Sequence, residues 1–294
     1  MGRDRALQWL RWAGLALAAL VALYLLIPIY VWLASEAVID RRYTLPRSLV
    51  RADSTADAIA RGARLAVIDG CADCHGAKLG GRLMRDDPGF PIQASNLRAL
   101  EQSYTDEDFD RAIRRGLRPD ASSLWAMPSQ AFVYVHDDDI AAILGYIRSL
   151  PPSGQTTPPP SFSDAARWQI VRGEIEPAAP LAMVQMPAID LGPHYDGGRY
   201  IAMMACGACH ATELTGSADG RAPDLNVTTR YSREQFFNLM RQGTNAHGLW
   251  LPTMGPLAHR RFHILKDWEI DPLYAYLVAR AKAPTLDQIS NSIR

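Results

Sequence analysis

The N-terminal segment is the longest run of apolar positions in the chain. Residues 12–35 include no charged side chain, and as an α-helix they would rise about 36 Å at about 1.5 Å per residue. That length exceeds the hydrocarbon core of a membrane, which is about 30 Å thick. Aromatic residues near both ends, as at the interfaces of a membrane-spanning helix, are Trp9, Trp12, Tyr30 and Trp32. The pattern predicts a transmembrane anchor within residues 1–40.

A cleaved signal peptide is the alternative interpretation of this segment. Its apolar core would be about 7–15 residues long and would be followed by small residues at a cleavage site. Residues 34–37 (Ala-Ser-Glu-Ala) resemble such a site, but the apolar run is longer than that of a signal peptide. We therefore expect a retained anchor. Arginines flank the run on both sides, so the positive-inside rule gives no orientation.

A pattern of polar and apolar residues occurs twice in the remainder of the chain. Residues 104–109 (Tyr-Thr-Asp-Glu-Asp-Phe) match residues 231–236 (Tyr-Ser-Arg-Glu-Gln-Phe). Thr105 and Ser232 are placed to cap a helix at its N-terminus. A glycine that suits a helix C-terminus follows the Tyr by 12 residues in both copies, at Gly116 and Gly243. The repeat predicts two similar helical domains.

The same pattern gives the remaining helices and the domain boundaries. Apolar residues recur at helical spacing over residues 137–150 and about 268–283, after each copy of the repeat. Residues 151–160 are rich in Pro and predict a stiff connector, whereas residues 161–193 are apolar enough to lie against the neighbouring domains. The predicted organisation is all-α, with an anchor at 1–40, a domain at 52–151, a linker at 152–193 and a second domain at 194–283.

Composition and charge exclude several classes of protein. The 294 residues are 48% hydrophobic and 21% charged, values that exclude a disordered or collagen-like chain. The 31 Lys and Arg residues balance 31 Asp and Glu residues, and no block of basic residues stands out. Binding to nucleic acid is therefore not expected, because nothing in the sequence would track a phosphate backbone.

All four cysteines occur in two copies of one pattern, Cys-x-x-Cys-His. The copies are Cys71-Ala-Asp-Cys74-His75 and Cys206-Gly-Ala-Cys209-His210. On a helical turn, thiols at positions i and i+3 reach one edge of a porphyrin and the following imidazole reaches its iron; this is the pattern of c-type haem attachment. A redox dithiol, a disulfide or part of a zinc site also uses Cys-x-x-Cys, but leaves the adjacent His unexplained in both copies. The motifs predict two covalently bound c-type haems.

With these motifs, residues 55–151 and 194–283 resemble class I cytochromes c. The resemblance implies thioether bonds from Cys71, Cys74, Cys206 and Cys209, and iron coordination by His75 and His210. It also implies haem attachment outside the cytoplasm, and hence a single-pass protein of the inner membrane with both haem domains in the periplasm. In this family a Pro carbonyl accepts a hydrogen bond from the iron-binding imidazole. Pro223 stands at that position in the second copy, and Ser95 in the first.

Two methionines occupy the position at which this family places the sixth iron ligand. Met127 and Met254 each follow the Tyr of the repeat by 23 residues and lie between two predicted helices. Methionine elsewhere is a flexible filler of cores. Three histidines near the second position, His247, His259 and His263, leave open whether Met254 or one of them is the ligand. In this family a Gly on the first helix lets an aromatic residue of the last helix approach closely, and the resemblance implies this role for Gly62 with Tyr146 and for Gly198 with Tyr276.

An iron with His and Met ligands has both axial positions filled, which favours electron transfer over substrate chemistry. We therefore expect the protein to have no enzymatic activity of its own. The runs around Met127 and residues 145–152 resemble the cytochrome subunits of membrane-associated alcohol and aldehyde dehydrogenases. The expected function is a membrane-anchored relay that accepts electrons from a periplasmic dehydrogenase or a quinol-oxidising complex and passes them to an oxidase or a soluble cytochrome. A dihaem subunit of a haem-copper oxidase and a dihaem peroxidase are the alternatives.

Overall fold

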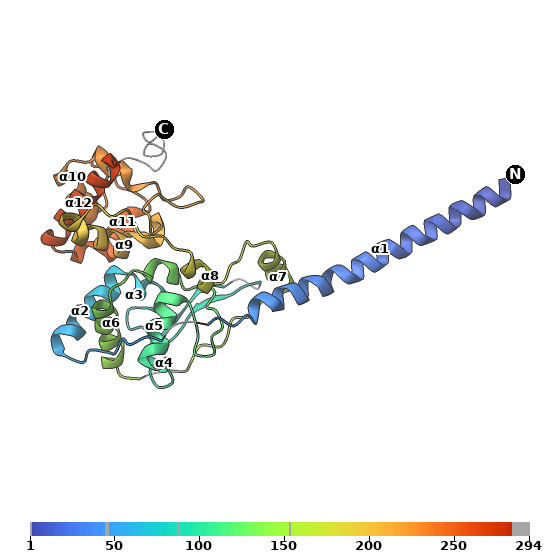
Figure 1. Ribbon diagram of the computed structural model, residues 1–294, viewed down its shortest axis with the longest axis horizontal. Coiled ribbons are helices and arrows are strands. Elements are labelled where there is room, and N and C mark those ends of the chain that lie inside the picture. The colour runs from blue at the N-terminus through green and yellow to red at the C-terminus, as the bar shows by residue number, and fades with distance from the viewer. Residues whose placement is uncertain (1, 45–46, 87–88, 153, 284–294) are drawn as a thin grey trace.

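The computed structural model describes residues 2–44, 47–86, 89–152 and 154–283 (Figure 1). It is mostly helical, as predicted. The first half contains α1 (Gly2–Ile39), α2 (Ala56–Ile68), α3 (Cys71–His75), β1 (Arg82–Arg85), β2 (Ile92–Ala94), α4 (Leu97–Leu100), α5 (Asp106–Arg115), η1 (Ser129–Phe132) and α6 (Asp137–Ser149). The second half contains α7 (Asp164–Val171), α8 (Ala178–Met183), η2 (Pro193–Tyr195), α9 (Asp196–His210), η3 (Leu225–Arg230), α10 (Arg233–Gln242), α11 (Met254–Arg260), η4 (Phe262–Ile264) and α12 (Asp267–Lys282).

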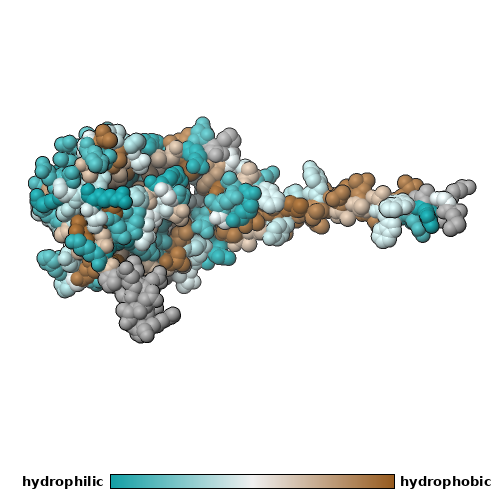
Figure 2. Space-filling view, turned by 90° about the horizontal axis from the view of Figure 1, so that it is seen from above, coloured by the Kyte–Doolittle hydropathy of each residue, from teal (hydrophilic) through white to brown (hydrophobic). Residues whose placement is uncertain are grey.

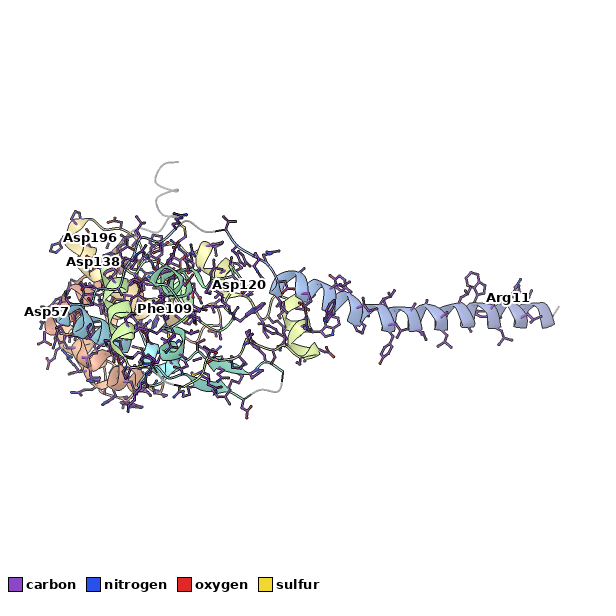
Figure 3. All side chains as sticks on the ribbon, turned by 90° about the horizontal axis from the view of Figure 1, so that it is seen from below. Arg11, Asp57, Phe109, Asp120, Asp138 and Asp196 are labelled. Atoms are coloured by element: carbon purple, nitrogen blue, oxygen red, sulfur yellow. The ribbon has the colours of Figure 1, made fainter. Side chains whose placement is uncertain are left out.

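Helix α1 projects away from the globular part of the molecule (Figure 1). Apolar side chains cover most of its length (Figure 2), and Arg11 lies near its far end (Figure 3). Among the described residues, α1 is the one helix long and apolar enough to cross a membrane, a statement about length and composition alone. Only its last turns are packed, where Val31 and Ser35 are buried. An anchoring role is consistent with this exposure.

The first unit, residues 52–151, is built on the crossing of α2 and α6 (Figure 1). Thr55 caps α2, and Thr105 forms a capping box with Asp108 at the start of α5. Helix α6 follows the predicted apolar spacing and buries Ile140 and Leu144 against Ile68 and Phe109 in the core. The predicted helix over residues 137–150 is therefore confirmed to within one residue.

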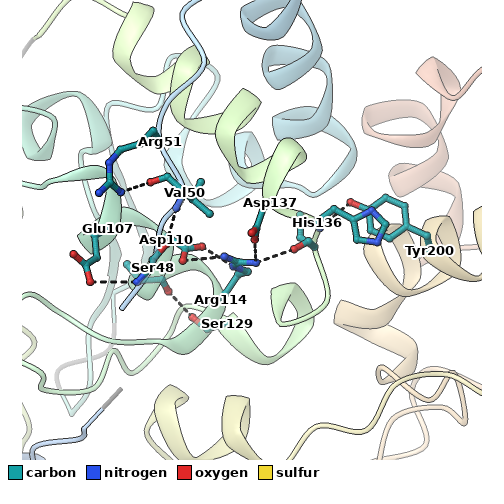
Figure 4. Close-up of polar contacts among 12 residues, drawn as sticks. Ser48, Val50, Arg51, Glu107, Asp110, Arg114, Ser129, His136, Asp137 and Tyr200 are labelled. Carbon is teal, nitrogen blue, oxygen red and sulfur yellow. Dashed lines mark hydrogen bonds and ion pairs between the residues drawn. The ribbon is translucent and has the colours of Figure 1, made fainter. Parts of the chain in front are cut away.

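Arg114 links two helices of this unit. Arg114 on α5 contacts both carboxylate oxygens of Asp110, and it reaches the Val135 carbonyl at 3.2 Å and the Asp137 carboxylate at 2.7 Å (Figure 4). It thereby ties α5 to the beginning of α6.

A short antiparallel hairpin of β1 and β2 pairs Arg82 with Ala94 and carries an irregularity after Leu83. Strand β1 is exposed, β2 is partly buried, and the hairpin is the one departure from an all-helical arrangement in the described residues.

The second unit, residues 194–283, repeats this arrangement with α9 crossing α12. Ser232 and Gln235 form the predicted capping box of α10, and Gly243 ends that helix in the left-handed conformation, as Gly116 ends α5. Helix α12 occupies residues 267–282, close to the predicted 268–283. The two units share their caps, their helix ends and their principal helix crossing.

The helix crossings depend on glycines, as expected. A Cβ on Gly62 would lie 1.9 Å from the Ala142 carbonyl oxygen, and one on Gly198 would lie 2.0 Å from the Pro272 carbonyl oxygen. In both units the contacted carbonyl lies four residues before the tyrosine that was expected at the crossing, Tyr146 or Tyr276. Tyr276 itself is fully buried against Gly198.

The linker lies against the rest of the molecule, as the sequence predicted. Arg167 on α7 donates a 2.6 Å hydrogen bond to Glu36 and lies over the Trp32 ring, so α7 holds the end of α1. Helix α8 packs against η1 and α5. Beyond it, the Gln185 carbonyl accepts from Tyr134 of the first unit, and the Ile189 carbonyl accepts from Tyr276 of the second. The linker thus contacts both units.

Candidate haem-binding sites

Each Cys-x-x-Cys-His motif lies on a helix, as c-type haem attachment requires. Helix α3 begins at Cys71, after Gly70 in the left-handed conformation, and ends at His75. The second motif forms the last turn of α9, which ends at His210. Within each motif, the two cysteines therefore lie one turn apart on the same face of the helix. None of the four cysteines forms a disulfide.

The two histidines have the same environment. His75 Nδ1 donates to the Ser95 carbonyl at 2.7 Å, and His210 Nδ1 donates to the Pro223 carbonyl at 2.7 Å. Both predicted acceptors are confirmed, including Ser95, which stands where the family has Pro. Burial lowers the pKa of both imidazoles, and the carbonyl only partly opposes this. Each is therefore a neutral imidazole with Nδ1 occupied, which directs Nε2 toward a metal.

The backbone after each histidine repeats the same hydrogen bonds. Gly81 N–H donates to the His75 carbonyl at 2.9 Å, and Gly216 N–H donates to the His210 carbonyl at 3.0 Å. A second pair of hydrogen bonds joins this turn to the segment that carries the acceptor carbonyl. Leu97 N–H donates to the Leu79 carbonyl at 2.9 Å, and Leu225 N–H donates to the Leu214 carbonyl at 3.0 Å. The two motifs are therefore held by equivalent loops despite different local sequences.

Met127 and Met254 also occupy equivalent positions. The amide three residues before each Met donates to the carbonyl of the glycine that ends the preceding helix: Leu124 to Gly116 at 2.7 Å, and Leu251 to Gly243 at 3.0 Å. Both methionines are partly buried and pack against the core. Their identity as sixth ligands remains a prediction, but the fold gives both the same loop.

The three competing histidines of the second unit are exposed. His247, His259 and His263 all lie on the surface, whereas Met254 packs against buried side chains at the first position of α11. A ligand to a buried iron needs a side chain that already faces the interior. This difference favours Met254 over the histidines.

The thiols and their surroundings disfavour a zinc site or a redox dithiol. Burial raises the pKa of Cys71 and of Cys206 to about 12, with the Asp69 charge adding to the effect at Cys71. Zinc binding and thiol redox chemistry both use thiolates, which such burial disfavours. In the described part of the chain, no group of three or more His, Cys, Asp or Glu side chains could hold a metal ion. The two motifs do not combine into one four-ligand site.

A buried carboxylate lies beside the first motif and was not predicted from the sequence. Asp69 directly follows α2, two residues before Cys71, and within the described residues neither of its carboxylate oxygens has a hydrogen-bond partner. Burial raises its pKa well above the ordinary value; repulsion by Asp139 adds to the rise, and Arg261 partly opposes it. No local signal marks Asp69, because its burial depends on residues far along the chain.

Replacing Asp69 with asparagine should stabilise the protein at neutral pH. Since the folded state raises this pKa, the unfavourable contribution of Asp69 grows as the pH rises above the ordinary aspartate value of about 3.9. We expect Asp69→Asn to gain about 1–3 kcal/mol at pH 7.5, because the neutral amide has no charged form to be penalised by burial or by Asp139, and little near pH 4. Denaturant unfolding at both pH values measures the difference. An equal effect at both pH values would contradict a raised pKa for the buried, unpartnered Asp69.

Comparison with known proteins identifies the first unit. Residues 59–151 match the family model for cytochrome c. Cytochrome c domains bind c-type haem covalently and transfer electrons, so this part of the chain is a haem-binding, electron-transfer domain. The family-model match ends at residue 151.

Similar proteins over longer stretches include cytochrome subunits of dehydrogenases. The chain is 27% identical over 275 residues to the fructose dehydrogenase cytochrome subunit of Gluconobacter japonicus, which covers 79% of this chain and 55% of that protein. It is 25% identical over 273 residues to the cytochrome c subunit of a quinone alcohol dehydrogenase of Gluconacetobacter polyoxogenes, with 79% and 58% covered. A diheme cytochrome c-type protein of Cereibacter sphaeroides is 26% identical over 168 residues, which cover 51% of this chain and 56% of that protein. The chain spans about half the length of these curated relatives.

Proposed function

We propose that this chain, whose residues 59–151 form a cytochrome c domain, is a membrane-anchored dihaem cytochrome c that relays electrons for a dehydrogenase. The second unit is proposed to be a second haem domain. Residues 1–40 are proposed to anchor the protein in the inner membrane, with both units in the periplasm. The acceptor is proposed to be an oxidase or a soluble cytochrome.

One observation carries the proposal: each motif histidine donates Nδ1–H to a backbone carbonyl at 2.7 Å, in loops with equivalent hydrogen bonds. The first of these loops lies in the recognised cytochrome c domain. The same environment around His210 supports the same role for the second motif. The similar diheme protein also supports two haems.

The residues that would hold each haem have chemistry that fits it. Cys71 and Cys74, or Cys206 and Cys209, would supply the sulfurs of two thioether bonds, while His75 or His210 would coordinate through Nε2. A c-type haem supplies a one-electron iron couple whose potential depends on axial ligand and burial. The Ser95 and Pro223 carbonyls fix each imidazole, and Met127 and Met254 would supply soft sulfur ligands that favour the reduced form.

The relatives support a dehydrogenase as the electron donor. Several are named as cytochrome subunits of fructose or alcohol dehydrogenases. A relay of this kind needs no substrate site of its own, because substrate oxidation occurs on the partner. Helix α1, with α7 packed at its end, supports a position for the first unit beside the membrane.

Haem counting tests the proposal. The pyridine haemochrome assay should give two c-type haems per chain for the full-length protein, and one for the variant carrying Cys206→Ser and Cys209→Ser. The matched variant with Cys71→Ser and Cys74→Ser should also give one. A single haem in the unmodified protein, lost only when the first motif is changed, would restrict the protein to one haem domain.

Copurification from detergent extract then identifies the donor, and recovery with a copper-containing oxidase instead of a dehydrogenase would contradict the proposed partner.

A further inference from the structure

The two units contact each other through the segments that carry the candidate iron ligands. Helix α9, which ends in the second motif, packs against η1, which begins two residues after Met127. In return, α11 begins at Met254, and the residues at its end reach α3, the helix of the first motif. The histidine-bearing helix of each unit therefore lies near the methionine-bearing segment of the other.

Arg261 is the centre of the second of these contacts. Its Nε donates to Asp73 Oδ2 at 2.6 Å, and Asp73 lies between the two cysteines of the first motif. The neighbouring Arg260 approaches the same carboxylate at 3.4 Å. The Arg261 guanidinium lies over Gly70, where a Cβ would be 2.1 Å from Cζ, so the backbone before Cys71 leaves room for it. Only 15% of the Arg261 side chain is exposed.

Other polar contacts hold the same interface. Arg64 on α2 pairs with Glu269 on α12 and donates to the Ile264 carbonyl at 3.2 Å. The Tyr200 ring on α9 stacks on the His136 ring with the ring centres 3.8 Å apart (Figure 4). The Tyr200 hydroxyl also donates to Asp139 in the first turn of α6. These contacts come from different helices of both units, so the relative position of the units does not depend on the linker alone.

We propose that Arg261 is a positioning residue that joins the first motif helix to the segment after Met254, so that electrons pass between the two haem sites across this contact. The exchange moves one electron: one site is oxidised as the other is reduced, with no bond made or broken. This inference rests on the proposed function, since it requires a haem in each unit. A partly buried cation beside the first motif also stabilises the reduced form of that site, because its charge is poorly screened.

Substitutions of the ion pair separate electrostatic from positional effects. Arg261→Met should lower the midpoint potential of the first site, whereas Asp73→Asn should raise it, because the two changes remove charges of opposite sign. Both should slow electron exchange between the sites at least tenfold, because both break the contact. Arg261→Lys keeps the charge and should keep the potential close to that of the unmodified protein. Spectroelectrochemistry measures the potentials, and absorbance changes after injection of a single electron by pulse radiolysis measure the exchange.

Arg233→Met is the matched control. Arg233 forms a two-bond ion pair with Asp271 at 2.6 and 2.7 Å within the second unit, away from the first motif. This variant should leave the first potential and the exchange rate unchanged. Equal results for Arg261→Met and Arg233→Met, with two haems bound in both, would overturn the inference. Fewer than two haems in the unmodified protein would instead remove the proposed function, and this inference with it.

Discussion

Replacing Met127 with alanine is expected to open one axial position of the first haem and to lower the potential of that haem. The methionine occupies the loop after α5 and packs against the core, so its sulfur is the candidate donor on that side. Losing a thioether ligand removes a preference for ferrous iron. We expect a fall on the order of 0.1 V, within the roughly 0.8 V that axial ligands span. Loss of the near-infrared methionine-to-iron band of the oxidised protein measures the ligand change directly.

Met254→Ala should give the same result at the proposed second haem, because its loop repeats the hydrogen bond from the Leu251 amide to the Gly243 carbonyl. Met84→Ala is the control, since Met84 is 40% exposed on the β1–β2 hairpin and lies outside both loops. If Met254→Ala preserves the methionine band and the spin state of the second haem, the assignment of its sixth ligand is wrong. A nearby histidine would then need a rearranged loop to become buried.

Much of this arrangement could be predicted from the sequence because its determinants are local. Thr105 and Ser232 cap helices whose first turns supply the partners of the capping box, and Gly116 and Gly243 take a left-handed conformation that glycine adopts without strain. The equal spacing from each Tyr to each Met predicted two equivalent loops, and the backbone bonds around those loops agree. Short-range patterns therefore located both motifs and both methionines.

What the sequence could not supply depends on residues far apart in the chain. Arg261 and Asp73 are separated by 188 positions, and neither has a local pattern that would pair it with the other. The contact of α7 with the end of α1 has the same character, because Arg167 meets Glu36 across 131 positions. The β1–β2 hairpin was missed because its strands have only four and three residues, too short for a periodic signal.

A methyl group on Gly198 is expected to disrupt the helix crossing of the second unit. The added Cβ would lie 2.0 Å from the Pro272 carbonyl oxygen and 2.8 Å from the Tyr276 Cβ, distances at which backbone or a fully buried side chain must move. Neither neighbour is the free end of a flexible side chain. We expect Gly198→Ala to destabilise the protein by about 3 kcal/mol, at the upper end of overpacking costs. This corresponds to a fall of roughly 6–12 °C in Tm for a protein of this size.

The adjacent glycine provides a matched control on the same helix. Gly197 is exposed, and a Cβ built on it meets nothing within 4 Å. Gly197→Ala should therefore leave Tm unchanged or raise it slightly, because alanine favours a helix by up to about 1 kcal/mol over glycine. Thermal unfolding followed by circular dichroism compares the two variants, and haem content reports on the second site. If both variants unfold at the same temperature, α9 and α12 do not cross as closely as the equivalence with α2 and α6 requires.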